Sequence, residues 1–158
     1  MSNSIFNDDF LEYITYLNKH KVEYVLIGGL AVNIHGFKRS TGDMDVFVNP
    51  TKENHEKLKR VHIDFRMPMG DMISFENFQN SKDYDVFRFG GGMYHIDVLT
   101  VCKGLDFDET YKASIESVFE GVKIRVVHLN QLIQAKEASG RYKDLEDVKQ
   151  LKKKNGLD

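Results

Sequence analysis

The feature that most restricts the fold of this chain is a short apolar run that ends at two adjacent glycines. Residues 22–27 are apolar apart from Glu23, with the β-branched and aromatic residues typical of a buried strand, and Gly28 and Gly29 follow at once. Residues 30–35 then fit one or two helical turns that end at Gly36, because glycine readily takes the left-handed conformation after a helix. This strand–turn–helix unit predicts a fold that combines helices with a sheet.

A second predicted strand carries two carboxylates on one face. Residues 43–48 alternate in polarity, so Asp43 and Asp45 should project to one side of the sheet while the residues between them enter the core. A third acid, Asp97, lies within residues 94–101, a run that also predicts a strand. Aspartate is disfavoured in strands, so three aspartates in apolar runs require an explanation.

A bound cation would explain these acids. Two short carboxylates on one face repel each other unless a cation lies between them, and Mg²⁺ prefers hard oxygen ligands together with water and substrate phosphates. The thirteen residues between Gly29 and Asp43 allow a short helix and a return loop, which would bring the free amides of a helix start beside the carboxylates. From the residues alone, a solvated strand face and an ordinary tight turn remain open alternatives.

The remaining pattern predicts further helices and two hairpins. Residues 66–83 are the least informative stretch and favour a loop with a short helix. No repeat or low-complexity tract interrupts the chain, which predicts one mixed α+β domain over residues 1–158, with C-terminal helices at about 129–153 packed on it. The predicted helices are 6–20, 51 to about 60, 108–114, 129–139 and 141–153, and the hairpins are 84–101 and 117–128.

Charge, cysteine count and hydropathy argue against several classes of protein. Twenty-two Lys and Arg against 24 Asp and Glu give a net charge of −2, which argues against a dedicated duplex nucleic-acid binding module. The single cysteine, Cys102, rules out an internal disulfide and fits a reducing, cytoplasmic setting. The apolar run 25–32 is far too short to span a membrane. Residues 1–9 contain no basic segment followed by an apolar stretch, so no secretory signal is expected.

The combined motif resembles a known superfamily. Gly28-Gly29, the thirteen-residue spacing, Asp43-Met44-Asp45-Val46 and the later Asp97 are similar to the DNA polymerase β-type nucleotidyltransferases. The resemblance is greatest to the minimal single-domain members of bacteria and archaea, which include antibiotic nucleotidyltransferases and proteins of toxin–antitoxin or abortive-infection loci. Residues 129–148 resemble their C-terminal helical segment. Many members have Gly-Ser where this chain has Gly-Gly, so backbone amides would have to do more of the phosphate binding.

This resemblance implies a fold and an activity. The expected fold is the α+β nucleotidyltransferase fold, a mixed sheet flanked by helices. The expected reaction is the transfer of a nucleoside monophosphate from an NTP to a hydroxyl of a small molecule or a protein, with release of pyrophosphate. Asp43, Asp45 and Asp97 would hold two Mg²⁺ ions, and Asp97 is also a candidate to accept the proton of the hydroxyl. Gly28, Gly29 and the amides after them would bind the triphosphate.

Two basic residues are further nucleotide-binding candidates. Arg39 lies just before the acids and could reach a phosphate through its two-pronged guanidinium. Lys136 could neutralise the β- or γ-phosphate, although an ordinary surface position is equally open for both residues. His95 alternates onto the face of Asp97 and could support it, although a structural histidine is the commoner case. Lys143 and Asp147 have the i,i+4 spacing of a helix pair, which favours a structural role for the charged residues near them, Arg141 and Asp144 among them.

A second function class stays open. The same fold could act as a non-catalytic nucleotide-binding module or as part of a toxin–antitoxin pair, working through a partner protein. Oligomerisation could also complete the cleft, because no second domain is visible to hold the acceptor. The three converging acids favour the enzyme, since a purely binding protein has little physical need for them.

Overall fold

The computed structural model describes residues 6–80 and 82–157. The expectation that no secretory signal is present rests partly on residues 1–5, which lie outside the described residues. The described helices are α1 (Asp8–Lys19), α2 (Gly28–Ile34), α3 (Lys52–Phe65), α4 (Phe75–Gln79), α5 (Phe107–Ala113), α6 (Leu129–Ser139) and α7 (Tyr142–Lys154), with a 3-10 turn η1 (Gly70–Ile73). The described strands are β1 (Tyr24–Ile27), β2 (Asp43–Val48), β3 (Val86–Gly91), β4 (Tyr94–Leu99), β5 (Ile115–Phe119) and β6 (Val122–Val126).

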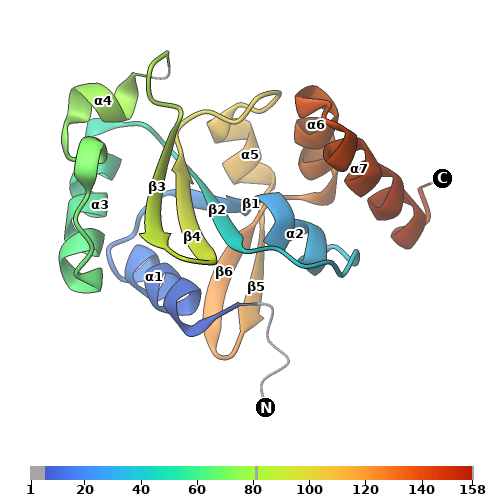
Figure 1. The fold of residues 1–158 in the computed structure, drawn as a ribbon, viewed down its shortest axis with the longest axis horizontal. Helices are drawn as coiled ribbons and strands as arrows, with labels where there is room; N and C mark the ends of the chain where they lie inside the picture. Colours follow the sequence, from blue (N-terminus) through green and yellow to red (C-terminus); the bar gives the residue numbers. More distant parts are fainter. Residues whose placement is uncertain (1–5, 81, 158) are drawn as a thin grey trace.

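The strands form one mixed sheet in the order β3-β4-β2-β1-β6-β5. Strands β2 and β4 run parallel, as do β1 and β6, whereas the other neighbours are antiparallel. In Figure 1, α1, α3 and α4 lie toward one side of the sheet, and the α6–α7 pair lies beyond α2 at the other. The predicted α+β class, with a mixed sheet and a C-terminal helical segment, is confirmed.

The central strands are buried because both faces of the sheet are covered near β1 and β2. All four residues of β1 are buried, as expected for an unbroken apolar run at the centre of a sheet. In β2 the alternation is as predicted: Met44 and Val46 are fully buried, whereas Asp43 and Asp45 remain partly accessible. The two acids therefore share one face of the sheet.

Helix α3 extends five residues further than the sequence suggested. Thr51 caps its start by accepting a hydrogen bond from the Asn54 amide at 3.2 Å. The helix continues past residue 60 because Val61 and His62 are buried in its apolar face. His62 Nε2 lies 2.8 Å from the Tyr13 hydroxyl, and burial lowers the pKa of this histidine to about 4. A histidine that is neutral at pH 7 therefore serves as a core residue.

Within the described part of the chain, every helix is too short or too polar to cross a membrane.

Candidate active site

The pairing of β2 with β4 brings the three aspartates together. Asp45 lies directly beside Asp97 in the parallel register, and Asp43 lies beside His95. Because parallel partners at the same register position point to the same face of a sheet, Asp45 and Asp97 project side by side. All three acids line a cleft of about 490 Å³. The structure thus collects the three acids that the sequence singled out.

The glycine turn fits closely against these acids. Gly28 starts α2 with φ +74°, and a Cβ at this position would overlap the Asp45 carboxylate. A Cβ on Gly29 would lie 2.8 Å from Thr41 Oγ1. No side chain caps the start of α2, where Ile27 holds the N-cap position. The first amides of α2 are therefore not consumed by a side-chain cap.

An arginine that the sequence analysis missed neutralises two of the acids. Arg88 of β3 donates from Nε and Nη2 to the two carboxylate oxygens of Asp97, each at 2.9 Å. The same Nη2 lies 3.2 Å from Asp43 Oδ2. The hairpin register, in which Gly91 faces Tyr94, places Arg88 directly opposite Asp97. Counting back from the glycine turn of the hairpin would have revealed this pair.

Asp43 and Asp45 have different environments. His95 Nδ1 lies 3.2 Å from Asp43 Oδ1, so His95 contacts Asp43 rather than the neighbouring Asp97. The Asp45 carboxylate accepts no hydrogen bond from another described side chain. Burial raises the pKa of Asp45 to about 7, and the charges of Asp97 and Asp43 add to this increase. The cluster therefore retains a carboxyl group that needs a further cation to be ionised below neutral pH.

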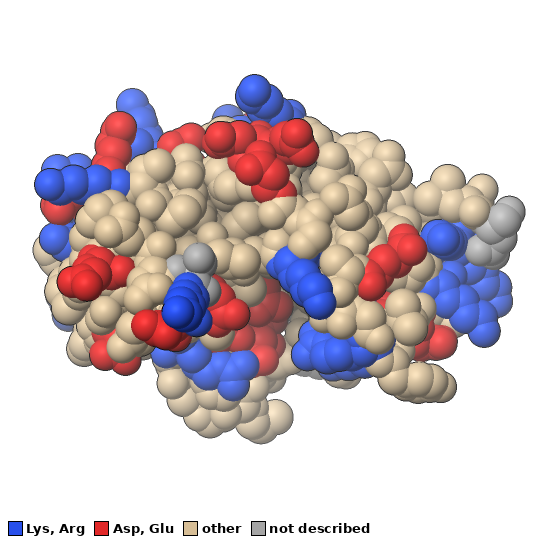
Figure 2. Space-filling model, turned by 90° about the horizontal axis from the view of Figure 1, so that it is seen from above, with Lys and Arg blue, Asp and Glu red and all other residues tan. Residues whose placement is uncertain are grey.

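The opposite wall of the cleft comes from the C-terminal helices. Lys136 of α6, together with Arg141 and Lys143 from the start of α7, lines the same cleft as the three acids. Figure 2 shows a hollow on this face, with acidic side chains inside it and basic side chains on either side. The cleft therefore has an acidic wall on the sheet and a basic wall on the helices.

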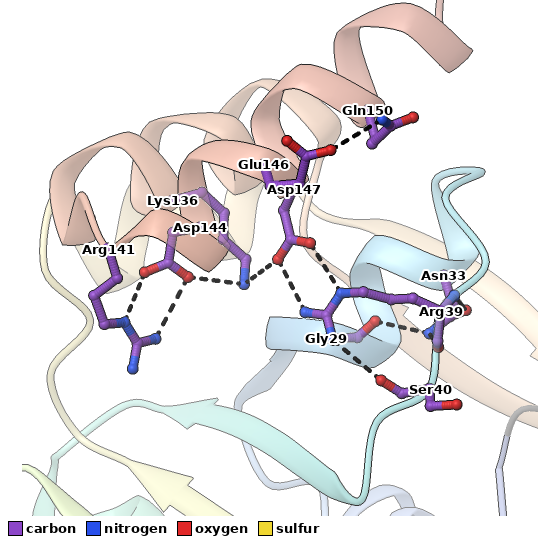
Figure 3. A network of polar contacts seen from close by, with 10 residues as sticks. All are labelled: Gly29, Asn33, Arg39, Ser40, Lys136, Arg141, Asp144, Glu146, Asp147 and Gln150. Carbon is purple, nitrogen blue, oxygen red and sulfur yellow. Dashed lines mark hydrogen bonds and ion pairs between the residues drawn. The ribbon is translucent and has the colours of Figure 1, made fainter.

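Two buried aspartates of α7 hold most of the basic wall in place. Arg39 donates from Nε and Nη2 to both carboxylate oxygens of Asp147, each at 2.9 Å. Lys136 Nζ lies 3.1 Å from Asp147 Oδ2 and 3.3 Å from Asp144 Oδ1, and Arg141 Nε donates to Asp144 at 2.7 Å. Figure 3 shows these side chains converging from the loop after α2 and from α6 and α7.

This network changes the roles expected from the sequence. The predicted helix pair of Lys143 with Asp147 does not form, because the Asp147 carboxylate faces Arg39 and Lys136 instead. Arg39 and Lys136 line the cleft as expected, but each is engaged by a buried carboxylate. Lys143 is exposed and is free of acidic partners within residues 6–80 and 82–157.

The charge of Asp144 is stabilised by its neighbours. Burial alone would raise its pKa, but hydrogen bonds from Arg141 and Ser139 and the charges of Lys136 and Arg141 lower it to about 2. Asp144 is therefore ionised throughout the physiological range and holds α6 against α7 by charge as well as by packing.

The carboxylates match a hard divalent ion in chemistry but are not arranged around one. Three carboxylates on adjacent strands provide the oxygen ligands that Mg²⁺ prefers, and burial, together with the charges of Asp97 and Asp43, raises the pKa of Asp45. Across residues 6–80 and 82–157, no three His, Cys, Asp or Glu side chains are grouped closely enough to hold a metal ion as they stand. The Arg88 guanidinium lies between two of these ligands instead.

Comparisons with known proteins agree with this architecture. The structure of the lincosamide antibiotic adenylyltransferase LnuA, with lincomycin bound, superposes with a TM-score of 0.59 at 16% identity, over 95% of this chain and 98% of that chain. A candidate nucleotidyltransferase from Thermotoga maritima superposes with a TM-score of 0.58 at 17% identity, over 88% of this chain and 87% of that one. At such identities the likeness shows the fold alone. A sequence search against curated proteins gives no match.

The family comparison covers the elements that build the cleft. The family described as "Nucleotidyltransferase of unknown function (DUF6036)" matches residues 8–158, from the start of α1 through α7. The match therefore includes the glycine turn, the three aspartates and the basic wall in one continuous segment. With the resemblance found in the sequence and the fold of the structural neighbours, this match shows that the chain belongs to that family of nucleotidyltransferases.

Proposed function

We propose that this chain is a single-domain enzyme that transfers a nucleoside monophosphate from an NTP to an acceptor hydroxyl. The observation that carries the proposal is the juxtaposition of Asp43, Asp45 and Asp97 at one cleft, beside the uncapped start of α2. In the reaction, the acceptor oxygen forms a bond to the α-phosphorus. The bond from that phosphorus to the bridging oxygen breaks, and pyrophosphate leaves with the electron pair.

Each acid has a proposed role. Asp43, Asp45 and Asp97 would hold Mg²⁺, with two ions expected from the superfamily resemblance. When bound there, Mg²⁺ supplies charge stabilisation for the reacting phosphates and lowers the pKa of a coordinated hydroxyl. A carboxylate oxygen of Asp97 is the proposed acceptor of the hydroxyl proton. The acids lie on β2 and β4, and β4, which carries Asp97, is the strand farther from β1 and the glycine turn that follows it.

The phosphates would bind between the glycine turn and the basic wall. The amides after Gly28 and Gly29 provide donors at the helix start, where the peptide dipoles favour an anion. Arg39 and Lys136 remain candidates for phosphate contact, but each would have to contact the phosphate while it also pairs with Asp147. Lys143 lines the cleft without such a partner, so we assign it the first phosphate contact.

The first test of this assignment is Lys143→Ala. We expect the KM for the NTP to rise about tenfold with kcat changed much less, since a charge-assisted phosphate contact is worth roughly 1.4 kcal/mol or more. The measurement is steady-state kinetics at saturating Mg²⁺. Lys149→Ala is the matched control, because Lys149 is an exposed lysine of the same helix that does not line the cleft. Equal KM values for the two variants would contradict the assignment.

The acceptor is proposed by comparison with the structural neighbour. LnuA is a lincosamide adenylyltransferase, so ATP and lincosamides are the first donor and acceptor to try. The cleft of about 490 Å³ lies in the range of small-molecule sites, so small hydroxyl compounds are tested before protein acceptors.

The experiment that tests the function is incubation of the purified chain with each of the four labelled NTPs, Mg²⁺ and a panel of hydroxyl acceptors. We expect pyrophosphate release and a labelled acceptor for one NTP, and loss of both for Asp97→Asn. Exposed Asp108→Asn is the matched control, since it removes an acid from the start of α5 outside the cleft. NTP binding without turnover across the panel would favour the non-catalytic module instead.

A further inference from the structure

Arg88 occupies the position that a metal ion would need. Both carboxylate oxygens of Asp97 accept hydrogen bonds from this guanidinium at 2.9 Å, and one oxygen of Asp43 lies 3.2 Å from it. Asp97 is nearly buried, with 8% of its side chain exposed, so few solvent-facing directions remain for another cation. A metal ion that coordinates these oxygens therefore competes with the guanidinium for the same carboxylates.

The guanidinium is able to leave. Arg88 lies on β3, the edge strand of the sheet, and 54% of its side chain is exposed. Among the described residues, its ion-pair partners are Asp97 and Asp43, and both belong to the acidic cluster. By contrast, Arg39 on the opposite wall is 17% exposed and is fixed by the buried Asp147. The two arginines make similar bidentate contacts, but only Arg88 has open solvent into which it can swing.

We propose that Arg88 is a built-in counter-cation of the acidic cluster, which a divalent metal must displace, so that this residue sets the metal affinity of the site. The inference rests on the proposed function, because it takes the three aspartates as the metal ligands. In the metal-free protein Arg88 holds Asp97 and Asp43 together against their repulsion. When a metal ion binds, it would replace the guanidinium at the carboxylate oxygens. The ion would then supply the positive charge that Arg88 supplies in the metal-free protein.

The test measures metal binding in the absence of nucleotide. The probe is Mn²⁺, followed by calorimetry and by loss of the free-ion signal in electron paramagnetic resonance. We expect Arg88→Gln to bind Mn²⁺ about tenfold more tightly than the wild type. The guanidinium no longer competes with the ion for the carboxylate oxygens, and a charge-assisted contact of this kind corresponds to roughly a factor of ten in affinity. Arg88→Lys, which keeps the charge but loses the two-pronged contact, should fall between them.

Controls separate this role from a purely structural one. Arg60→Gln removes an exposed arginine of α3 and should leave Mn²⁺ affinity unchanged. Adding Asp45→Asn to Arg88→Gln should abolish the tight binding, which places the ion at the cluster. Mn²⁺ should also raise the melting temperature of Arg88→Gln more than that of the wild type, since a tighter ligand stabilises more.

The outcomes distinguish the inference from the proposed function. If the wild type and Arg88→Gln bind Mn²⁺ equally at the cluster, the inference is wrong and the proposed function stands. If Arg88→Gln melts lower than the wild type without binding more tightly, Arg88 is a structural ion pair only. If neither protein binds Mn²⁺, both the metal role of the acids and this inference fail. If Arg88→Gln does not fold, the same readings are taken on Arg88→Lys, whose affinity must exceed that of the wild type.

Discussion

Replacing Asp147 with asparagine is expected to lower the free energy of unfolding by about 3 kcal/mol, because removing one partner of a buried ion pair leaves the other charges uncompensated. The Asp147 side chain is 2% exposed, and it accepts both donors of Arg39 while also facing Lys136. These two cations are themselves mostly buried, at 17% and 13% exposed. The measurement is urea denaturation followed by circular dichroism, with the midpoint and the slope compared against the wild type.

The neighbouring residue provides the control for this prediction. Glu146 is exposed and its Oε1 contacts only the Gln150 amide, at 3.1 Å, among the described residues. Glu146→Gln should therefore change stability by less than about 0.5 kcal/mol, as is usual for a surface substitution. A loss below 1 kcal/mol for Asp147→Asn would mean that Arg39 and Lys136 find water or another partner. The α6–α7 pair would then not depend on this carboxylate.

Much of the fold was predictable because it follows from local patterns. The apolar run of β1, the alternation of β2 and the glycine at the end of α6 each determine local structure within a few residues. Helix α3 was predicted too short because the burial of its last turns depends on distant segments, as when His62 contacts Tyr13, 49 positions earlier. The order of the strands depends on such long-range packing as well, and no local pattern determines it.

In the candidate site, too, some residues could be predicted from local sequence and others depend on distant segments. The acids could be predicted because aspartate within a strand is uncommon enough to be noticed. Arg88 could not be distinguished by type, since an arginine on an exposed strand face is ordinary, and only the hairpin register shows that it lies opposite Asp97. The Lys143–Asp147 prediction was wrong because helical spacing shows which residues can meet, whereas Arg39, more than a hundred positions away, makes the better-placed pair.

Asp45→Asn is expected to stabilise the metal-free protein while removing its activity. In chelator, the raised pKa of Asp45 means that the folded state binds more protons than the unfolded state between about pH 4 and pH 7. Stability from this group is therefore fully present below pH 4 and falls as the pH rises through about 7. Asparagine carries no charge, so the variant should be about 3 kcal/mol more stable than the wild type at pH 8 and should lose this pH dependence.

The same substitution removes a proposed metal ligand, and turnover is expected to fall about 1000-fold or more, as when a principal source of transition-state charge stabilisation is lost. The two measurements are urea denaturation at pH 4 and pH 8 in chelator, and pyrophosphate release with Mg²⁺ present. Loss of activity alone would fit any damaged site, and a gain in stability alone would fit any relieved charge. Their occurrence together requires an acid cluster held under electrostatic strain for a cation, whereas a destabilised Asp45→Asn would show that the carboxylate is already satisfied without one.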